Sequence, residues 1–407
     1  MTEQASTGDG NNTEDASFTQ ASPVLAINEE EYEPQLARKL EKLQALFSSL
    51  GPLPALEVFR SERSHYRMRA EFTVWGTSVK TLAAGGDPDV HYVMYDSSSG
   101  IKPAPRIRID QFPVGSRLMN ELMTVVREEA NRAPAIRERL FQVNFHTALS
   151  GESMVTLIYH KVLDDVWREA GLLLRARLAK VAGTNGHIPH VIGRSRKQRM
   201  ELDHAYITEV LQVNGKSFTN RQVEGSFSQP NGGVCQHMLS WAQRVTTPTD
   251  SLPIQSLDTP QALTSEAGAA VEGNTGDGTA VAVTTQPGLQ HDMLELYCGN
   301  GNFTIPLASN FRRVVATEMA KTSVDAARHN MTANGLSNIF VARMSSEEFS
   351  EAWRTKATKR RLQGLGDWDS LRLDTILVDP PRSGLDAATV KLVSAFDRVV
   401  YISCNPG

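Results

Sequence analysis

The sequence has little cysteine, and its three cysteines lie far apart, at Cys235, Cys298 and Cys404 in a chain of 407 residues. No Cys-x-x-Cys pair or Cys/His cluster occurs, which argues against a zinc site, an iron–sulfur cluster and a disulfide framework. There is also no run of eighteen apolar residues and no basic, apolar leader at the N-terminus. We therefore expect no membrane span and no secretory signal, and we predict a cytoplasmic protein.

Lysine and arginine are missing from two long segments. Residues 1–30 contain six acidic residues and no basic one, and residues 246–291 are rich in Thr, Ser, Gly, Ala and Pro. Neither segment has a sustained apolar period, so we predict a disordered tail over 1–30 and a disordered insertion over 246–291. The formal net charge of −4 arises from these segments, because the remaining chain is net basic.

Residues 31–225 combine helical patterns with short apolar runs. The spacing predicts an amphipathic helix over 33–50 and a second helix near 164–183. Strand-like runs are predicted over residues 70–75, 90–96, 106–112, 140–149, 154–160 and 190–195. This pattern is typical of an α+β domain with antiparallel strand pairs.

The part of the chain after residue 291 alternates regularly between strand and helix patterns. Strand-like runs begin at residues 293, 313, 338, 374 and 398, and helical or polar stretches separate them. Such alternation predicts an α/β fold with a parallel sheet covered by helices on both faces. Because ligands bind such sheets at the carboxyl ends of the strands, we searched those ends for functional residues.

The first of these strands runs into a glycine turn, Gly299-x-Gly301, with Thr304 where a third glycine would complete a dinucleotide fingerprint. The second strand ends at Glu318, seventeen positions after Gly301. An acid at that place usually binds ribose hydroxyls, although it could instead be a charge that favours the start of the next helix. A turn without phosphate-binding charge suits a nucleoside-like cofactor, so we predict S-adenosylmethionine.

Two further strands end in polar residues next to proline. Asp379 precedes Pro380 and Pro381, but Arg382 stands where amino-group methyltransferases carry an aromatic residue, which disfavours that chemistry. Cys404 ends the last strand. It could be a buried thiol, since cysteine is often buried, or a nucleophile. Methylation of carbon 5 of a pyrimidine needs a nucleophile that adds to carbon 6, and a thiolate suits that role.

Several motifs together resemble one family. "SFSQPN" (226–231), "LELYCGNGNF" (294–303), "DPPRSGLD" (379–386) and "YISCNP" (401–406) are similar to the RNA 5-methyluridine methyltransferases. "HYRMRAEF" (65–72) and "YHKVLDDVW" (159–167) resemble the tRNA (uracil-5-)-methyltransferases in particular. The four-cysteine iron–sulfur motif of the ribosomal-RNA relatives does not occur here, which favours tRNA.

The resemblance implies a fold and a reaction. A class I, Rossmann-like methyltransferase domain over 226–407 would follow an α+β RNA-binding domain over 31–225. Its activity would be S-adenosylmethionine-dependent methylation of carbon 5 of the T-loop uridine at position 54 of tRNA. The alternatives are the same chemistry on ribosomal RNA or a tRNA-like RNA, and an RNA-binding or RNA-folding chaperone without turnover.

The resemblance also implies site residues. Cys404 matches the nucleophile, and the cofactor-contacting positions match Gln229, Tyr297, Asn302, Glu318 and Asp379. Phe141 and Gln142 fall in the part that meets the T-arm of tRNA, where Phe141 could stack on a base or, alternatively, pack in the core.

Basic residues of the same region offer phosphate contacts. Arg67 and Arg69 share one face of a strand and are predicted to bind phosphates. A basic run follows further along the chain, either for the same purpose or as a solvated face, and consists of Arg194, Arg196, Lys197 and Arg199.

The sequence departs from the family after the Ser-Cys-Asn-Pro motif. The family continues there with the last strands of the sheet and a glutamate that acts as general base, whereas this chain stops at Gly407. We therefore expect a C-terminally truncated chain without that base.

Overall fold

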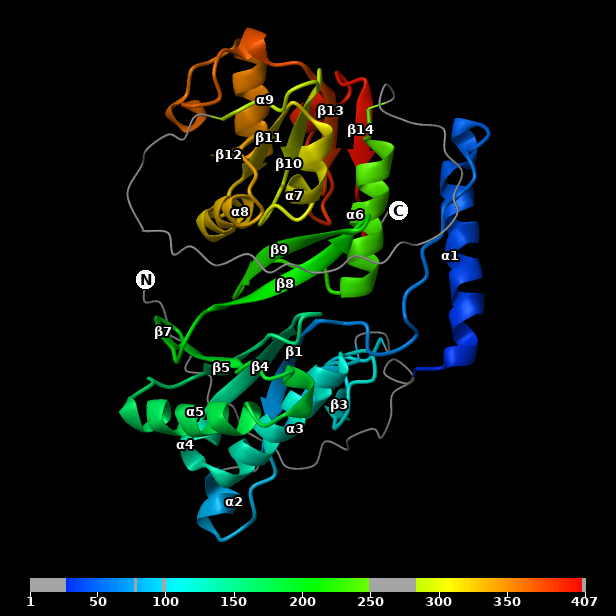
Figure 1. The fold of residues 1–407 in the computed structure, drawn as a ribbon. Helices are drawn as coiled ribbons and strands as arrows, with labels where there is room; N and C mark the ends of the chain where they lie inside the picture. Colours follow the sequence, from blue (N-terminus) through cyan, green and yellow to red (C-terminus); the bar gives the residue numbers. More distant parts are fainter. Residues whose placement is uncertain (1–26, 77–78, 97–99, 249–282, 405–407) are drawn as a thin grey trace, which may run out of the picture. The chain divides into compact units, whose positions relative to one another are not determined.

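The computed structural model describes residues 27–76, 79–96, 100–248 and 283–404 (Figure 1). Most of the predicted tail and insertion lies outside these residues. The chain divides into two compact units. The first comprises the described residues up to Leu211 together with Gln222–Cys235, and the second comprises Gln212–Arg221 together with the described residues from Gln236 onward. The domain boundary predicted between residues 225 and 226 thus lies within a segment that belongs to the first unit.

The first unit is built on a seven-stranded sheet in the order β3-β2-β1-β4-β5-β6-β7. All neighbouring strands are antiparallel except β5 and β6, which are parallel. The strands are β1 (Arg69–Trp75), β2 (His91–Tyr95), β3 (Arg106–Ile109), β4 (Leu140–Thr147), β5 (Ser153–Tyr159), β6 (His190–Ser195) and β7 (Gln198–Glu201). The six predicted strands are confirmed, and β7 is an addition.

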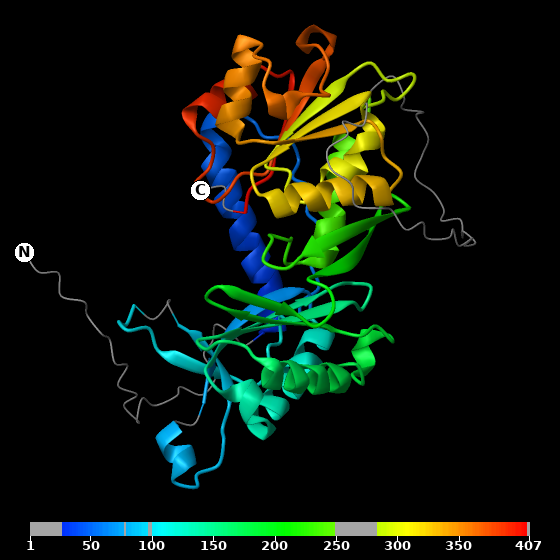
Figure 2. The ribbon, with the colours of Figure 1, turned by 90° about the vertical axis from the view of Figure 1, so that its left-hand side faces the viewer.

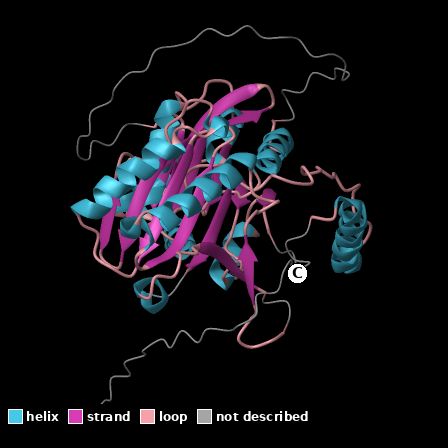
Figure 3. Ribbon diagram, turned by 90° about the horizontal axis from the view of Figure 1, so that it is seen from below, coloured by secondary structure: helices cyan, strands magenta, loops and turns pink. Residues whose placement is uncertain are grey.

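Helices α3 (Arg117–Arg132), α4 (Pro134–Arg137) and α5 (Asp165–Leu178) cover one face of this sheet (Figures 1 and 3). The unit also contains α1 (Tyr32–Phe47), which buries no residue, and the short helix α2 (Val79–Ala83). Phe72 of β1, Phe145 of β4 and Trp167 of α5 are buried in one apolar core, which places alternate strand residues toward the helices. The residues between them, such as Thr73 and its register partner Gln142, therefore face the other way.

A two-stranded hairpin and one helix follow in the chain. The hairpin consists of β8 (Tyr206–Val213) and β9 (Lys216–Val223), and α6 (Gly232–Val245) comes next. Asn214 and Gly215 form the turn with φ values of 48° and 79°, as a two-residue hairpin turn of this kind requires. The tip of the hairpin belongs to the second unit.

The second unit contains a five-stranded, wholly parallel sheet in the order β12-β11-β10-β13-β14. The strands are β10 (Asp292–Leu296), β11 (Arg313–Glu318), β12 (Ile339–Arg343), β13 (Leu373–Val378) and β14 (Arg398–Tyr401). The helices are α7 (Thr304–Leu307), α8 (Lys321–Ala333), α9 (Ser346–Thr355) and α10 (Ala387–Val393). The strand order reverses at β10, which lies between β11 and β13.

Both faces of the parallel sheet pack against helices (Figures 1 and 2). Leu294 and Leu296 of β10 join an apolar cluster with Phe349 of α9. Glu295, between these leucines, points to the opposite face, where its carboxylate meets Thr304 of α7. The α/β fold with a parallel sheet, predicted from the strand–helix alternation, is confirmed.

Candidate active site

The predicted residues of the second unit lie at one edge of its sheet. Tyr297 directly follows β10, Glu318 is the last residue of β11, and Asp379 directly follows β13. Cys404 comes three residues after the end of β14. Because all of these strands are parallel, their carboxyl ends meet at the same edge, next to the reversal of strand order where open α/β sheets bind ligands.

The turn after β10, residues 297–303, has an unusual backbone. Tyr297, Gly299 and Gly301 have positive φ values of 62°, 56° and 85°. A side chain is costly in this region, so glycine is the natural residue at two of the three positions. At Gly301 an added Cβ would also approach Cγ1 of Ile305 to 3.3 Å. The turn thus presents its bare backbone at the sheet edge.

Tyr297 takes this conformation despite its large side chain. Its hydroxyl is 2.7 Å from Oγ of Ser346, the first residue of α9, and its ring packs against the apolar cluster beneath. Strained backbone of this kind persists where surrounding contacts over-determine it, and such positions are common at ligand sites. The contacts of Tyr297 fix both its ring and the start of the turn.

Glu318 accepts hydrogen bonds from the backbone of two segments, the glycine turn after β10 and the residues just before α8. Its Oε2 accepts from the N–H of Gly299 at 3.2 Å, and its Oε1 accepts from the N–H of Ala320 at 2.7 Å. The bond from Ala320 ties Glu318 to the start of α8. This is the other role that the sequence allowed for Glu318, a charge that favours the start of the next helix. An ionised carboxylate has about four acceptor positions, so two remain for the hydroxyls of a ribose.

A buried carboxyl that the sequence reading missed lies beneath this turn. Glu295 is completely buried and accepts a 2.6 Å hydrogen bond from Thr304 Oγ1. Burial, with a smaller contribution from the charge of Asp379, raises the pKa of Glu295 to about 8. Burial also raises the pKa of Asp379 to about 6. The sequence does carry a signal for this residue, because Glu295 is an acidic residue inside an apolar strand, two positions before the turn 297–303.

The negative charge in this site comes from Glu318 and Asp379, because Glu295, with a pKa of about 8, is protonated near pH 7. Burial, and then the carboxylates of Glu295 and Glu318, raise the pKa of the Cys298 thiol. A set of carboxylates around an open backbone turn suits a ligand that carries positive charge and ribose hydroxyls. S-adenosylmethionine, with its sulfonium and ammonium groups, fits these residues; a pyrophosphate-bearing dinucleotide does not.

Cys404 is exposed at the end of β14. In the described part of the chain this exposure does not fit a buried structural thiol, and the role of Cys404 as a nucleophile stays a prediction.

Gln229 belongs to the first unit, in the segment 226–231 before α6. Its neighbours are fixed by hydrogen bonds within that unit. The carbonyl of Pro230 accepts from the N–H of Met68 at 2.7 Å, and Asn231 Nδ2 donates to Ser61 Oγ at 2.6 Å. Two motifs that are far apart in the sequence, 65–72 and 226–231, are thus hydrogen-bonded to each other.

Arg67 and Arg69 take part in the same arrangement. Nε of Arg67 donates to the carbonyl of Arg69 at 2.8 Å. Arg69 donates to the carbonyl of Ser226 and forms a 3.0 Å ion pair with Glu71. Both arginines have internal partners, and their contact with phosphate stays a prediction.

Burial, and to a smaller extent the charge of Arg69, lower the pKa of His146 to about 3, so this histidine is neutral.

Phe141 lies at an irregularity in β4. The register between β4 and β5 shifts between Leu140 and Gln142, and the ring of Phe141 is 41% exposed. A bulge of this kind redirects a side chain out of the regular alternation, and here it contradicts core packing of Phe141. The ring of His160, which the sequence reading did not single out, lies 4.6 Å from that of Phe141.

Gln142 is the next residue of β4 and has polar neighbours. Its Nε2 donates to Oδ1 of Asn144 at 2.7 Å and to Oε2 of Glu71 at 3.2 Å. The side chains form a polar row on the face of the sheet opposite the helices.

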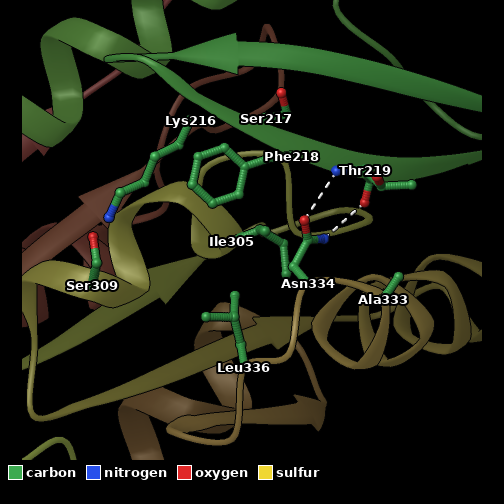
Figure 4. A pocket seen from close by; sticks show the side chains of 9 residues that line it. All are labelled: Lys216, Ser217, Phe218, Thr219, Ile305, Ser309, Ala333, Asn334 and Leu336. Atoms are coloured by element: carbon green, nitrogen blue, oxygen red, sulfur yellow. Dashed lines mark hydrogen bonds between the residues drawn. The ribbon is translucent and has the colours of Figure 1, made fainter. Parts of the chain in front are cut away.

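A cavity of about 550 Å³ lies elsewhere in the second unit (Figure 4). It is lined by Lys216, Ser217, Phe218, Thr219, Ile305, Ser309, Ala333, Asn334 and Leu336. The predicted cofactor residues and Cys404 do not line it, so it is separate from the strand-end site.

No group of three or more His, Cys, Asp or Glu side chains that could hold a metal ion occurs among the described residues. Among the same residues, no helix has both the length and the apolar character needed to cross a membrane.

Comparison with known proteins identifies relatives over most of the chain. Residues 31–253 and 278–407 match the family described as tRNA (Uracil-5-)-methyltransferase. A tRNA/tmRNA (uracil-C(5))-methyltransferase of Shewanella oneidensis is 42% identical over 383 residues, which cover 94% of this chain and 88% of the relative. One from Vibrio vulnificus is 41% identical over 384 residues, with the same shares covered.

A solved structure shares the fold. The tRNA (uracil-54, C5)-methyltransferase of Pyrococcus abyssi, in complex with S-adenosyl-L-homocysteine, aligns with a TM-score of 0.56 and 18% sequence identity. The alignment covers 92% of this chain and 74% of that one.

Proposed function

Because this chain belongs to the tRNA (uracil-5-)-methyltransferase family, whose enzymes methylate carbon 5 of uracil in tRNA with S-adenosylmethionine, we propose that it modifies the T-loop uridine at position 54 through a covalent adduct with Cys404. The observation that carries this proposal is the exposed thiol of Cys404 at the same sheet edge as Glu318 and Asp379. A nucleophile and a cofactor site at one edge are what a two-substrate transfer needs.

In this proposal the residues at the family's cofactor-contacting positions hold S-adenosylmethionine. Glu318 accepts hydrogen bonds from the ribose hydroxyls, and Tyr297 and Asn302 contact the cofactor from the turn. Asp379 and Gln229 complete the set. When bound, S-adenosylmethionine supplies an electrophilic methyl group. The carboxylates of the site favour a cationic ligand over a neutral one, since opposite charges attract strongly where water is excluded.

Cys404 activates the base. Its thiolate adds to carbon 6 of the uracil, and the electron pair of the 5,6 double bond moves toward the carbonyl at carbon 4 as an enolate. Carbon 5 thereby becomes nucleophilic and can accept the methyl group. Release of the thiolate requires a general base that takes the proton from carbon 5 so that the double bond re-forms. No described residue is assigned this role here.

The first unit binds the T-arm of the tRNA in this proposal. Phe141, turned outward by the bulge in β4, stacks on an unstacked base of the loop, and Gln142 offers an amide to a base edge. Arg67 and Arg69 contribute positive charge near the segment 226–231.

A tRNA-like RNA is a second substrate, favoured by the tmRNA named for the relatives in Shewanella and Vibrio. Such an RNA offers the same loop. We place the reaction in the cytoplasm, where these RNAs are.

The test uses unmodified tRNA and a matched transcript with cytidine in place of uridine 54. Each is incubated with the protein and S-adenosylmethionine, and two readouts are taken: 5-methyluridine by mass spectrometry of nucleosides, and the protein–RNA adduct on denaturing gels. We expect an adduct with the uridine transcript, none with the cytidine transcript, and loss of the adduct in Cys404→Ala. An adduct that persists in Cys404→Ala would refute the role of this thiol. Methylation at another uridine would refute the position.

A further inference from the structure

Asn330, in α8, joins three separate parts of the second unit. Its side chain is completely buried. Its Oδ1 accepts from the N–H of Arg221 in β9 at 2.7 Å, and its Nδ2 donates to the carbonyl of Asn300 at 2.9 Å. Asn300 Nδ2 in turn donates to the carbonyl of Arg221 at 3.0 Å. These three hydrogen bonds form a closed ring between the helix, the hairpin and the turn after β10.

Asn334 lies one helical turn later and makes similar bonds to the same strand. Its Oδ1 accepts from the N–H of Thr219 at 2.9 Å, and its Nδ2 donates to the carbonyl of Thr219 at 2.8 Å (Figure 4). Residues 219 and 221 of β9 present their backbone groups on the same edge, so the two asparagines bond to that edge as a neighbouring strand would. In the hydrogen bonds described, only Asn330 also reaches the turn.

The bond from Asn330 matters to the turn because of where it acts. Asn300 lies between Gly299 and Gly301, both with positive φ, and two residues before the predicted cofactor residue Asn302. The Asn300 side chain is itself buried, so its carbonyl has little access to water as a replacement partner. Removing the amide of Asn330 takes one hydrogen bond from the Asn300 carbonyl and one from the Arg221 N–H, which favours a different peptide orientation.

We propose that Asn330 is a positioning residue for the methyl donor: by holding the Asn300 peptide it keeps the turn 297–303 in the conformation that binds S-adenosylmethionine. The proposal rests on the function proposed above. It assigns to Asn330 no contact with the cofactor or the base, and it predicts that cofactor affinity depends on this side chain more than on Asn334.

The experiment compares two isosteric variants, Asn330→Asp and Asn334→Asp. Each keeps an oxygen that can accept from β9 and loses an amide donor. Affinity for S-adenosylhomocysteine is measured by calorimetry at a temperature where thermal unfolding shows both variants to be folded. We expect a loss of about tenfold in Asn330→Asp, equivalent to about 1.4 kcal/mol, and less than about twofold in Asn334→Asp. Equal losses in the two variants would overturn the proposal.

A second variant keeps the test decisive if Asn330→Asp does not fold. Asn300→Ala removes the bond to Arg221 but keeps the peptide carbonyl that Asn330 holds. We expect it to retain affinity within about threefold, which corresponds to the low end of the contribution of one hydrogen bond to a neutral group. A loss as large as that of Glu318→Ala would overturn the proposal, because the turn would then depend on Asn300 and not on the bond from Asn330.

Glu318→Ala separates this inference from the proposed function. If Glu318→Ala and Asn330→Asp both leave the affinity unchanged, the cofactor site itself is misassigned. If only Glu318→Ala weakens binding, the site stands and the role of Asn330 is refuted. A merely structural role would lower the melting temperature of the Asn330 and Asn334 variants alike and would leave their affinities equal.

Discussion

The second unit places its candidate residues at the ends of parallel strands, whereas Arg69, Phe141 and Gln142 of the first unit lie within strands of a mainly antiparallel sheet. At a strand end the position of a residue follows from the order and direction of the strands. On a sheet face it follows from register, and a single irregularity such as the one at Phe141 decides which way a side chain points.

The two regions also differ in charge. Glu318 and Asp379 supply the negative charge of the site in the second unit. Burial raises the pKa of Asp379 to about 6 and that of Glu295 to about 8, so Glu295 is protonated near pH 7. In the first unit, Arg69 is paired with Glu71 and Arg194 with Glu224. The acidic site suits a small cation, and its electrostatics should respond to pH. The basic side chains are partly neutralised, so shape and stacking should matter more for RNA than charge does.

The sharpest test of this division is Glu318→Ala. In the proposed function it removes the acceptor for both ribose hydroxyls. Hydrogen bonds to charged groups contribute about 1.5–3 kcal/mol each, so we expect S-adenosylmethionine to bind about 100-fold more weakly. RNA affinity should stay unchanged. Calorimetry for the cofactor and filter binding for tRNA measure the two effects. Glu351→Ala, at an exposed carboxylate of α9 paired with Arg354, is the control. Equal losses for cofactor and RNA would break the division.

The reciprocal variant is Phe141→Ala. Stacking of a base on an aromatic ring contributes about 1–3 kcal/mol, so we expect tRNA to bind about 30-fold more weakly. Cofactor affinity should not change. Phe141→Tyr keeps the ring and should retain most of the RNA affinity. If the alanine variant binds tRNA normally, the bulge in β4 serves another purpose.

The pH dependence of cofactor binding gives a smaller effect. The pKa of Asp379 is raised to about 6 in the cofactor-free protein, and its ionised form favours a cation. Affinity for S-adenosylmethionine should therefore rise as pH increases from 5 to 7, by up to about tenfold for one released proton. Asp379→Asn should remove the rise. Calorimetry in buffers of different ionisation enthalpy counts the proton, and a flat profile in the unmodified protein would contradict the assignment.

The smallest effect is expected at Arg194. Its guanidinium pairs with the buried carboxylate of Glu224 at 3.1 Å, so little of its charge remains for a phosphate. Arg194→Ala should change tRNA affinity by less than about twofold, and it should lower the salt slope by less than the ~1 unit of a full phosphate contact. A fall of the salt slope by a full unit would mean that Arg194 leaves Glu224 and pairs with a phosphate when RNA binds.

The second unit could be predicted largely from its sequence. Strand–helix alternation predicted the parallel sheet, and the ends of its strands predicted where Glu318, Asp379 and Cys404 would lie. The burial of Glu295 could not be predicted in the same way. Its hydrogen-bond partner Thr304 stands out in the sequence only because it occupies the place of a third glycine. The side chain of Asn330 bonds to the backbone of Arg221, which is 109 positions earlier in the chain. The apolar periodicity of a sequence does not indicate contacts of this kind.

The first unit was harder to predict. Its strands were found from apolar runs, but α3 and the β8–β9 hairpin were not, although Asn214-Gly215 between two alternating runs is a strong hairpin signal. The outward turn of Phe141 depends on a register shift that one sequence does not reveal. The internal bonds of Arg69 depend on a segment 157 residues away, so its strand spacing alone indicated only which face it shares.

The hydrogen bonds between the segments near residues 61–69 and 226–231 also have a consequence for synthesis on the ribosome. Asn231 bonds to Ser61, which is 170 residues earlier. At about 5–20 residues per second, the start of β1 waits roughly 10–30 s for these partners to be translated. By then the hairpin tip, Gln212–Arg221, has already emerged, although it belongs to the second unit. The nascent chain thus cannot complete its first unit before it has begun its second, and a ribosome that stalls between residues 212 and 226 leaves both unfinished.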